Sequence, residues 1–554
     1  MALTFRSFVR VHGVLLAILA LAAGVRFRGI AFGLPDVDAR PDETTVMNLA
    51  IGFFTGDLNP HFFNYPTLYP YCLFGLYACY YVWGTLRGEF ASLSDLAARY
   101  ASDPTRFFLL DRALSALAGT ATVYVVYRIG SQLAGRRTGL IAAFFLALAH
   151  LHVRDSHFGV TDVAATLLIT CSVLFILRAT DDWSPGNWLV AGALAGLATA
   201  TKYAGALLVL SAALAILFYS RHRGRTRPAL LFLSGLLVAF LMGCPFALFD
   251  ASRFASDFAA EAEHLRLGHR LILGRGWWYH LKYTLPIGLG RTLFLAALVG
   301  IPILMKRDWR KAAVFLAFPL AYYAVAGSGQ TVFVRYMIPL LPFLSITAAV
   351  FVSAAGGLLP ARGAVPKALA IAALALLVIL PSIRKVVLTD RLLATKDSRQ
   401  LAIEWARREI PRGSSVCLAG PIWHQETRSE ALDRLSSRRA AVPAAPLDPI
   451  SSYKLLTYDQ VSGRFKVGDA VQTSLPDYVV LRESPLLAIG GAPQGLKDLV
   501  AASYRLKASF HALDLQASHW FDMQDGFFIP LAGFAGVQRP GPNIYVYQKR
   551  DSPP

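Results

Sequence analysis

Long apolar stretches alternate with short polar ones over the first 383 residues of the chain. A stretch of about 18 or more apolar residues is long enough to cross a bilayer as a helix. This pattern predicts about 11 spans, near residues 11–32, 107–128, 138–153, 161–179, 187–202, 203–219, 228–248, 283–305, 312–327, 335–355 and 367–383. We therefore expect a polytopic α-helical membrane domain over residues 1–383.

The pattern changes at about residue 384, where polar residues become frequent and the long apolar runs stop. This segment, 384–554, predicts a soluble α/β domain. Asp397 is a suitable N-cap for a helix that continues through Arg408. Alternating or β-branched runs predict strands at Ser415–Leu418, Tyr478–Leu481 and Ile544–Tyr547.

Composition supports a membrane protein, because 55% of the residues are hydrophobic and only 16% are charged. The net charge of +19 would suggest nucleic acid as partner of a soluble protein. Here, however, the basic residues gather in short loops such as 221–227 and 306–311, as the positive-inside rule describes. The five cysteines are scattered and predict neither a disulfide framework nor a zinc site. The first apolar stretch is interpreted as an uncleaved span rather than a signal peptide, because many spans follow it.

One further apolar segment, residues 67–87, decides the topology. If it lies along the membrane surface as a juxtamembrane or re-entrant helix, the basic loops 128–137, 221–227, 306–311 and 362–367 all face the cytoplasm. The first outer loop, 33–66, then shares the opposite face with residues 154–160, 249–280 and 327–334, and with the C-terminal domain. We expect a multi-pass protein of the inner (plasma) membrane whose C-terminal domain is extracytoplasmic.

The tetrapeptide Arg40-Pro41-Asp42-Glu43 lies in this first outer loop. Pro41 fixes its own φ and favours an extended Arg40, so Asp42 is presented at the membrane boundary. Carboxylates there are costly unless they have a function, and a positioned carboxylate can act as a general base. The alternative is a solvated acid or a carboxylate at a helix N-terminus.

A second acid, Asp162, opens a predicted span, where it could also be an ordinary carboxylate at a helix N-terminus. Asp155 precedes it by seven residues, but Gly159 favours a turn between them, and we expect Asp155 to be exposed. Arg112, Lys202 and Arg335 lie near the outer ends of predicted spans. They could bind an anionic lipid head group or simply extend toward the membrane surface.

Two further motifs lie in the first outer loop. Residues 55–68 are rich in turn formers and aromatic side chains, which predicts an ordered loop that either stacks on sugars or forms an interfacial aromatic belt. Asp36 and Asp38 form a D-x-D pair, a weak signal for a metal–nucleotide site.

Taken together, these motifs resemble the C-type, polyprenyl-phosphate-dependent glycosyltransferases, especially bacterial relatives of lipid A aminoarabinose transferase and protein O-mannosyltransferases. The resemblance covers residues 10–350. It rests on Pro41-Asp42-Glu43, Gly56-Asp57, Tyr65-Pro66, Arg112, Asp162, Thr201-Lys202, His264, Trp277-Trp278-Tyr279, Arg335-Tyr336, Pro339 and Pro342.

The resemblance implies roles for these residues. Asp42 is similar to the family's catalytic base, and Asp162 to the acid that shapes the site. The residues expected to bind substrate are Glu43, Arg112, Lys202, Tyr203, His264, Arg335 and Tyr336. Tyr65 replaces the family's lysine, so Lys202, Arg112 or Arg335 would bind the lipid phosphate instead.

The expected activity is transfer of a sugar from polyprenyl phosphate to a hydroxyl or amine of a lipid, glycan or protein, with inversion. We expect no organic cofactor, and a divalent cation stays an open alternative. A transporter or lipid flippase is the main rival, although the sequence shows no second copy of the acidic loop. A structural or sensor protein would leave Asp42 unexplained.

Overall fold

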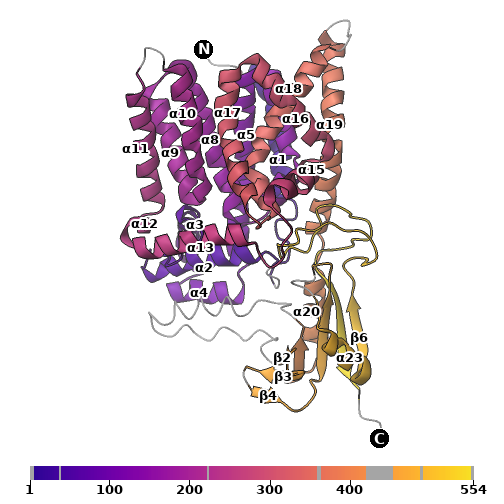
Figure 1. The fold of residues 1–554 in the computed structure, drawn as a ribbon. Coiled ribbons are helices and arrows are strands. Elements are labelled where there is room, and N and C mark those ends of the chain that lie inside the picture. The colour runs from indigo at the N-terminus through magenta and orange to yellow at the C-terminus, as the bar shows by residue number, and fades with distance from the viewer. Residues whose placement is uncertain are drawn as a thin grey trace. The chain divides into compact units, whose positions relative to one another are not determined.

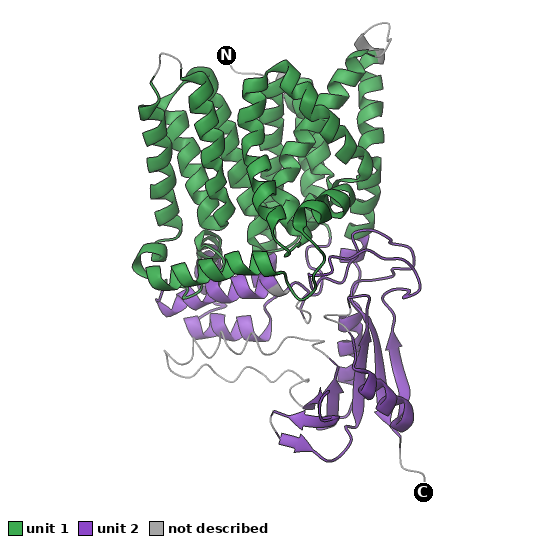
Figure 2. Cartoon of the chain, in the orientation of Figure 1, with its two compact units in different colours: residues 1–28, 58–75, 110–390 green, residues 29–57, 76–109, 391–554 purple. Residues whose placement is uncertain are grey.

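The computed structural model describes residues 5–35, 39–220, 224–358, 364–419, 453–468, 470–486 and 491–550. They fall into two compact units (Figure 2). Unit 1 comprises residues 1–28, 58–75 and 110–390, and unit 2 comprises residues 29–57, 76–109 and 391–554. The first loop and the C-terminal segment therefore share a unit although they are far apart in sequence. The Asp36–Asp38 pair and parts of two basic loops, 221–223 and 362–363, lie outside the described residues.

Unit 1 is a bundle of helices (Figure 1). Its long helices are α1 (Phe5–Phe27), α5 (Thr105–Ala134, which begins in unit 2), α6 (Arg136–Ala147), α8 (Thr161–Asp182), α9 (Pro185–Thr201), α10 (Leu208–Tyr219), α11 (Thr226–Gly243), α13 (Ala251–Leu267), α16 (Arg291–Arg307), α17 (Trp309–Ser328), α18 (Leu341–Leu358) and α19 (Ala364–Leu393, which ends in unit 2). Short elements join them: α7 (His150–Asp155), η2 (Tyr203–Leu207), α12 (Phe246–Phe249), α14 (Gly276–Tyr279), η3 (His280–Thr284), α15 (Leu285–Leu289) and η4 (Val334–Leu340).

Among the described residues, six helices are long and apolar enough to cross a membrane, or seven if one bent pair counts as a single span. The predicted count of about 11 spans is therefore not confirmed. The bent pair, Gly276–Leu289 and Arg291–Arg307, turns by 113°. The predicted span near residues 283–305 falls on this pair, and it is bent because Gly290 has a φ of +89°, which does not continue a helix.

Close helix packing fixes the end of α9. A Cβ atom on Gly192 would lie 2.0 Å from the carbonyl oxygen of Phe232 in α11, and one on Gly196 would lie 2.2 Å from that of Leu236. Glycines four residues apart let two helix backbones approach in this way. Lys202 directly follows the last residue of α9, so this contact also sets the position of its side chain.

The two ends of helix α8 make different contacts within unit 1. Its 22 residues span about 33 Å. Asp162 lies in the first turn. At the other end, the carboxylate of Asp181 accepts hydrogen bonds from Gln132 at 2.8 Å and from Lys311 at 2.5 Å. The end of α5 and the start of α17, which carry two of the predicted cytoplasmic loops, therefore meet at the end of α8 remote from Asp162.

Unit 2 combines short helices with a sheet. The helices are α2 (Pro41–Gly52), η1 (Phe53–Thr55), α3 (Leu68–Leu86, which begins in unit 1), α4 (Leu93–Ser102), α20 (Ser398–Glu409) and α23 (Gln494–Ser503). The strands are β1 (Ser415–Leu418), β2 (Lys454–Asp459), β3 (Arg464–Val467), β4 (Ala470–Gln472), β5 (Tyr478–Glu483), β6 (Tyr504–Phe510) and β7 (Asn543–Lys549). They form one sheet in the order β4-β3-β2-β1-β5-β7-β6.

This sheet confirms the predicted α/β character of the C-terminal segment. Strand β1 is parallel to β2 and β5, and the remaining pairs are antiparallel. The three predicted strands correspond to β1, β5 and β7. The predicted cap is also confirmed, because a carboxylate oxygen of Asp397 accepts a hydrogen bond from the Arg399 backbone N–H at 2.8 Å. Cys417, Val479 and Leu496 are fully buried in the core between the sheet and α23.

Within unit 2, the first loop packs against the C-terminal segment. The side-chain amide of Gln400 donates a hydrogen bond to the Leu34 carbonyl oxygen at 2.7 Å. The rings of Phe32 and Phe527 meet edge to face, with centroids 5.9 Å apart. These contacts fix the segment that leads into α2.

Candidate active site

Asp42 and Glu43 lie in the first turn of α2, where the helix dipole favours carboxylates. Pro41 is the first helical residue, and Arg40 before it is extended, with φ −138° and ψ 98°, which confirms the prediction. The side chain of Asp42 is 31% exposed, whereas Glu43 is buried. Asp42 is therefore the acid of this pair that a substrate can reach.

Arg40 connects Asp42 to the C-terminal segment. Its guanidinium is completely buried, pairs with the carboxylate of Asp525 and lies 3.6 Å from that of Asp42. A buried cation needs such partners, because removing a charge from water is costly. Sequence reasoning missed Asp525. The available signal was the arginine at a helix N-terminus, where a cation is disfavoured without an anion nearby.

The second acid, Asp162, pairs with Lys202 inside unit 1. Its carboxylate contacts the ammonium group of Lys202, and that group also lies 5.2 Å from the centroid of the Tyr336 ring. The pair forms because α8 starts at Thr161, while α9 ends at Thr201 and leaves Lys202 extended. The Lys202 side chain is 21% exposed and the Asp162 side chain only 4%. A cation held in this way is available to an anionic group.

Several predicted residues surround this pair. Arg335, Asp162 and Glu261 of α13 all lie within electrostatic range of the Tyr336 hydroxyl. Arg335 stacks on Phe333, with its guanidinium carbon 4.0 Å from the ring centroid. Glu261 was not singled out from the sequence because it lies on a strongly charged helix face.

Tyr203 and His264 make structural contacts. The Tyr203 hydroxyl donates a hydrogen bond to the Phe63 carbonyl oxygen at 2.6 Å. The His264 ring is hydrogen-bonded to the His269 ring, with 3.0 Å between Nε2 and Nδ1. The backbone carbonyl of His264 also accepts a hydrogen bond from Thr331. Both residues therefore order segments beside the Lys202 pair, and their contact with substrate stays a prediction.

Arg112 is buried in α5, within electrostatic range of His157.

The turn predicted between Asp155 and Asp162 is confirmed, because α7 ends at Asp155 and α8 begins at Thr161. The expectation that Asp155 is exposed is wrong. Its carboxylate is completely buried and pairs with Arg154 at 3.0 Å, because α7 lies inside the bundle.

Asp111 is a further acid that sequence reasoning missed. Its carboxylate accepts a hydrogen bond from the Tyr69 hydroxyl at 2.7 Å. It lies so close to Gly159 that a Cβ atom there would be 2.1 Å from its oxygen. An acid within an apolar span is the signal that could have identified it.

The aromatic loop before α3 is ordered, as predicted. The backbone N–H of Phe63 donates to the Asp257 carboxylate at 2.8 Å, and the side-chain amide of Asn59 donates to that of Asp250 at 2.9 Å. Tyr65 packs near Phe62 with ring centroids 6.0 Å apart. Asp250, directly before α13, and Asp257 within α13 therefore hold this loop in place.

No cluster of three or more histidine, cysteine or acidic side chains suited to a metal ion occurs in the part of the chain that the structure describes. The D-x-D pair lies outside that part. The site residues are divided between the units: Asp42 and Glu43 belong to unit 2, and the other predicted site residues belong to unit 1.

Comparison with known proteins gives one family match. Residues 111–249 match the model of the dolichyl-phosphate-mannose-protein mannosyltransferase family. This segment contains Arg112, Asp162, Lys202 and Tyr203, but covers only part of the chain. A comparison with curated proteins gives no match.

The fold is similar to that of ArnT from Cupriavidus metallidurans bound to undecaprenyl phosphate. The TM-score is 0.51 at 16% identity, over 97% of this chain and 98% of that one. The archaeal oligosaccharyltransferase AglB from Archaeoglobus fulgidus, in complex with an inhibitory peptide and a dolichol-phosphate, gives a TM-score of 0.46 at 14% identity, over 80% of this chain. The chain spans 65% of the length of AglB. The family match and the ArnT-like fold confirm the predicted resemblance to polyprenyl-phosphate-dependent glycosyltransferases and give the transporter alternative no support.

Proposed function

We propose that this protein is a membrane glycosyltransferase that moves a sugar from a polyprenyl-phosphate donor to an acceptor hydroxyl or amine. The observation that carries the proposal is the ammonium group of Lys202, which lies between the carboxylate of Asp162 and the ring of Tyr336. A partly exposed cation held by a carboxylate in the first turn of α8 is suited to a phosphate. The family match and the ArnT-like fold support the same donor class.

In the proposed reaction, the acceptor oxygen or nitrogen attacks the anomeric carbon and loses its proton to Asp42. The bond between that carbon and the phosphate oxygen breaks, and the lipid phosphate leaves with the bonding electrons. Attack opposite the leaving group inverts the anomeric centre, through a transition state with oxocarbenium character. Lys202 neutralises the charge on the leaving phosphate, and Asp162 holds Lys202 in position. Phosphate is a good leaving group at neutral pH, so no strong general acid is required.

The remaining predicted residues have supporting roles in this proposal. Glu43 supports Asp42, while Arg112, Tyr203, His264, Arg335 and Tyr336 contribute to substrate binding. The acceptor is a lipid, glycan or protein group. The D-x-D pair keeps a divalent cation as an alternative contributor.

We further propose that the reaction occurs on the extracytoplasmic side of the inner membrane, where the C-terminal domain, residues 384–554, also lies. The grouping of loops 128–137 and 306–311 at the end of α8 remote from Asp162 supports this topology, because basic loops mark the cytoplasmic side.

The test is transfer by the purified full-length chain from radiolabelled polyprenyl-phosphate sugars. We expect label to leave the lipid, which a transporter would not cause. Asp42→Asn removes the base and should lower the rate by about 10²–10⁴-fold without changing thermal unfolding. Glu89→Gln, which alters an exposed acid of the same unit, serves as the control and should keep normal transfer. Near-normal transfer by Asp42→Asn would overturn the assignment of the base.

A further inference from the structure

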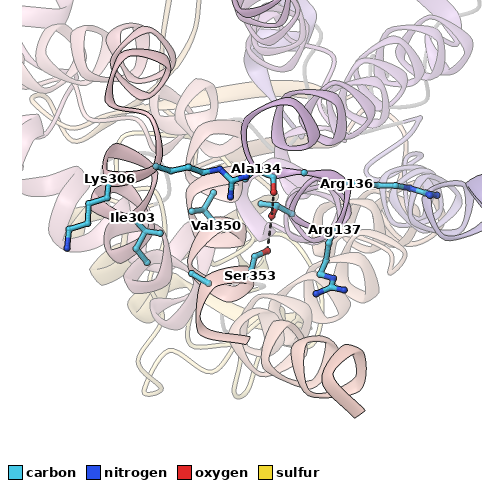
Figure 3. A pocket seen from close by; sticks show the side chains of 11 residues that line it. Ala134, Arg136, Arg137, Ile303, Lys306, Val350 and Ser353 are labelled. Carbon is cyan, nitrogen blue, oxygen red and sulfur yellow. Dashed lines mark hydrogen bonds between the residues drawn. The ribbon is translucent and has the colours of Figure 1, made fainter. Parts of the chain in front are cut away.

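A pocket of about 630 Å³ opens in unit 1 between the α5–α6 turn, the end of α16 and α18 (Figure 3). Four basic residues line it: Arg136, Arg137, Lys306 and Arg307. Figure 3 shows Lys306 and Arg136 on opposite sides, with Ser353 and Arg137 between them. The pocket is therefore surrounded by positive charge from two separate elements.

This pocket is remote from the proposed reaction site. Gln132, two residues before the lining residue Ala134, is hydrogen-bonded to Asp181 at the C-terminal end of α8. Asp162 lies at the other end of that helix, about 30 Å away along its axis. The pocket thus needs an explanation other than binding of the reacting sugar phosphate.

Among the described residues that line the pocket, none is an acid. The acids nearby have other partners. The carboxylate of Asp181 accepts hydrogen bonds from Gln132 and Lys311, and that of Asp308 caps α17 through the Lys311 backbone N–H. Arg137, Lys306 and Arg307 are exposed, so their charges are accessible to an anion.

The rest of the lining suits an amphiphilic anion. The Thr138 hydroxyl donates a hydrogen bond to the Ala134 carbonyl oxygen at 3.1 Å and lies 2.9 Å from the Ser353 hydroxyl, so these groups form a polar part of the lining (Figure 3). Helix α6 begins at Arg136 with no acid in its first turn, so its positive dipole end adds to the charge. Ile303, Val350 and Ala354 supply apolar walls.

We propose that this pocket binds the phosphate group of an anionic membrane lipid. A basic pocket between helix ends, on the side that the proposed topology makes cytoplasmic, has the chemistry of a lipid head-group site. Soluble phosphate shares that chemistry, but it would not use the apolar walls. The proposal is independent of the transferase activity.

The test measures lipid binding to the purified, delipidated full-length chain by native mass spectrometry. The probes are cardiolipin, phosphatidylglycerol, phosphatidylcholine and, as a separate arm, inorganic phosphate in competition with phosphatidylglycerol. The pocket variant is Arg137→Gln/Lys306→Gln/Arg307→Gln. The control variant, Arg178→Gln/Arg227→Gln/Arg310→Gln, removes the same charge from residues that do not line the pocket.

We expect the wild-type chain and the control variant to prefer both anionic lipids over phosphatidylcholine. The pocket variant should bind them on the order of 100-fold more weakly, since each basic residue contributes about fivefold. Efficient competition by inorganic phosphate would identify soluble phosphate as the source of the ligand. Equal binding of phosphatidylcholine, or undiminished binding by the pocket variant, would overturn the proposal. Sugar transfer by the pocket variant in a defined lipid provides a separate measure that it is folded.

Discussion

The contact between Asp525 and Arg40 predicts that the C-terminal segment positions the candidate base. Asp525→Asn keeps the size of the side chain and removes its charge, while Arg40 stays completely buried. Breaking a buried ion pair by removing one partner costs about 3–5 kcal/mol. Asp42 would compensate in part. At 3.6 Å from Arg40 its attraction is about 5 kcal/mol with an effective dielectric constant near 20, but the 31% exposure of its side chain reduces this value.

We therefore expect the free energy of unfolding to fall by about 2–3 kcal/mol. Arg40 should also move toward Asp42 and pair with it more closely, which withdraws that carboxylate from the acceptor. The transfer rate kcat should drop about 100-fold, the lower limit for loss of a general base. The KM for the donor should stay unchanged, because in the proposed mechanism Lys202, and not Asp42, binds the phosphate. A smaller fraction of folded molecules would also lower the apparent kcat at constant KM, so the rate is expressed per folded molecule, with the folded fraction taken from thermal unfolding.

The assay combines thermal unfolding of the full chain with steady-state transfer of labelled sugar. A cycle of Arg40→Gln, Asp525→Asn and the double variant isolates the pair, and we expect a coupling of about 2 kcal/mol or more. The matched control is Asp514→Asn, whose acid is exposed in the same segment and should change stability by less than about 0.5 kcal/mol. Wild-type kcat and stability in Asp525→Asn would refute the reasoning.

Three further predictions concern other contacts. Lys202→Met should raise the donor KM about 10–100-fold, because a charge-assisted hydrogen bond to phosphate contributes about 1.5–3 kcal/mol; steady-state kinetics measure this. The Lys466 ammonium holds the pKa of Asp459 well below its usual range. The stability that this carboxylate contributes is therefore present above its unfolded pKa of about 3.9 and is lost as the pH falls toward the folded value. Thermal unfolding of Asp459→Asn and wild type should differ at neutral pH and converge in strong acid. Gly159→Ala should destabilise the chain by about 1–3 kcal/mol, since its Cβ would overlap Asp111.

Each of these predictions has a control and a contradicting result. Lys282→Met changes a lysine that lies over Tyr283, and it should leave the donor KM unaltered. A constant stability difference between Asp459→Asn and wild type from neutral to strongly acid pH would exclude the proposed linkage. Gly186→Ala is the neutral comparison for Gly159→Ala, because its Cβ would be 3.7 Å from the nearest atom. Equal stability of both alanine variants would contradict the overlap argument.

Local patterns predicted much of this structure. Runs of apolar residues indicated where helices form, and the cap at Asp397 followed from side-chain chemistry close in sequence. Asp162 and Lys202 were also recognisable, because each interrupts an apolar segment where a charge is costly. Their direct contact supports the reasoning that singled out both residues.

Long-range contacts were not predictable in this way. Asp525 lies 485 residues after Arg40, in a segment without helical or strand periodicity, so no local pattern relates them. The burial of Asp155 depends on α7 lying inside the bundle, which the apolar profile does not reveal. The turn at Gly290 depends on backbone geometry that a run of apolar residues conceals.

The membership of α2 and the C-terminal sheet in one unit restricts how this protein can be re-engineered. Replacing residues 391–554 with the corresponding domain of a relative, in order to change acceptor choice, would also remove Asp525 and Gln400. Such a chimera would lose both the anion that neutralises Arg40 and the amide that holds the Leu34 carbonyl. Successful domain exchange therefore requires that the incoming domain restore these two contacts, or that residues 29–57 be exchanged with it.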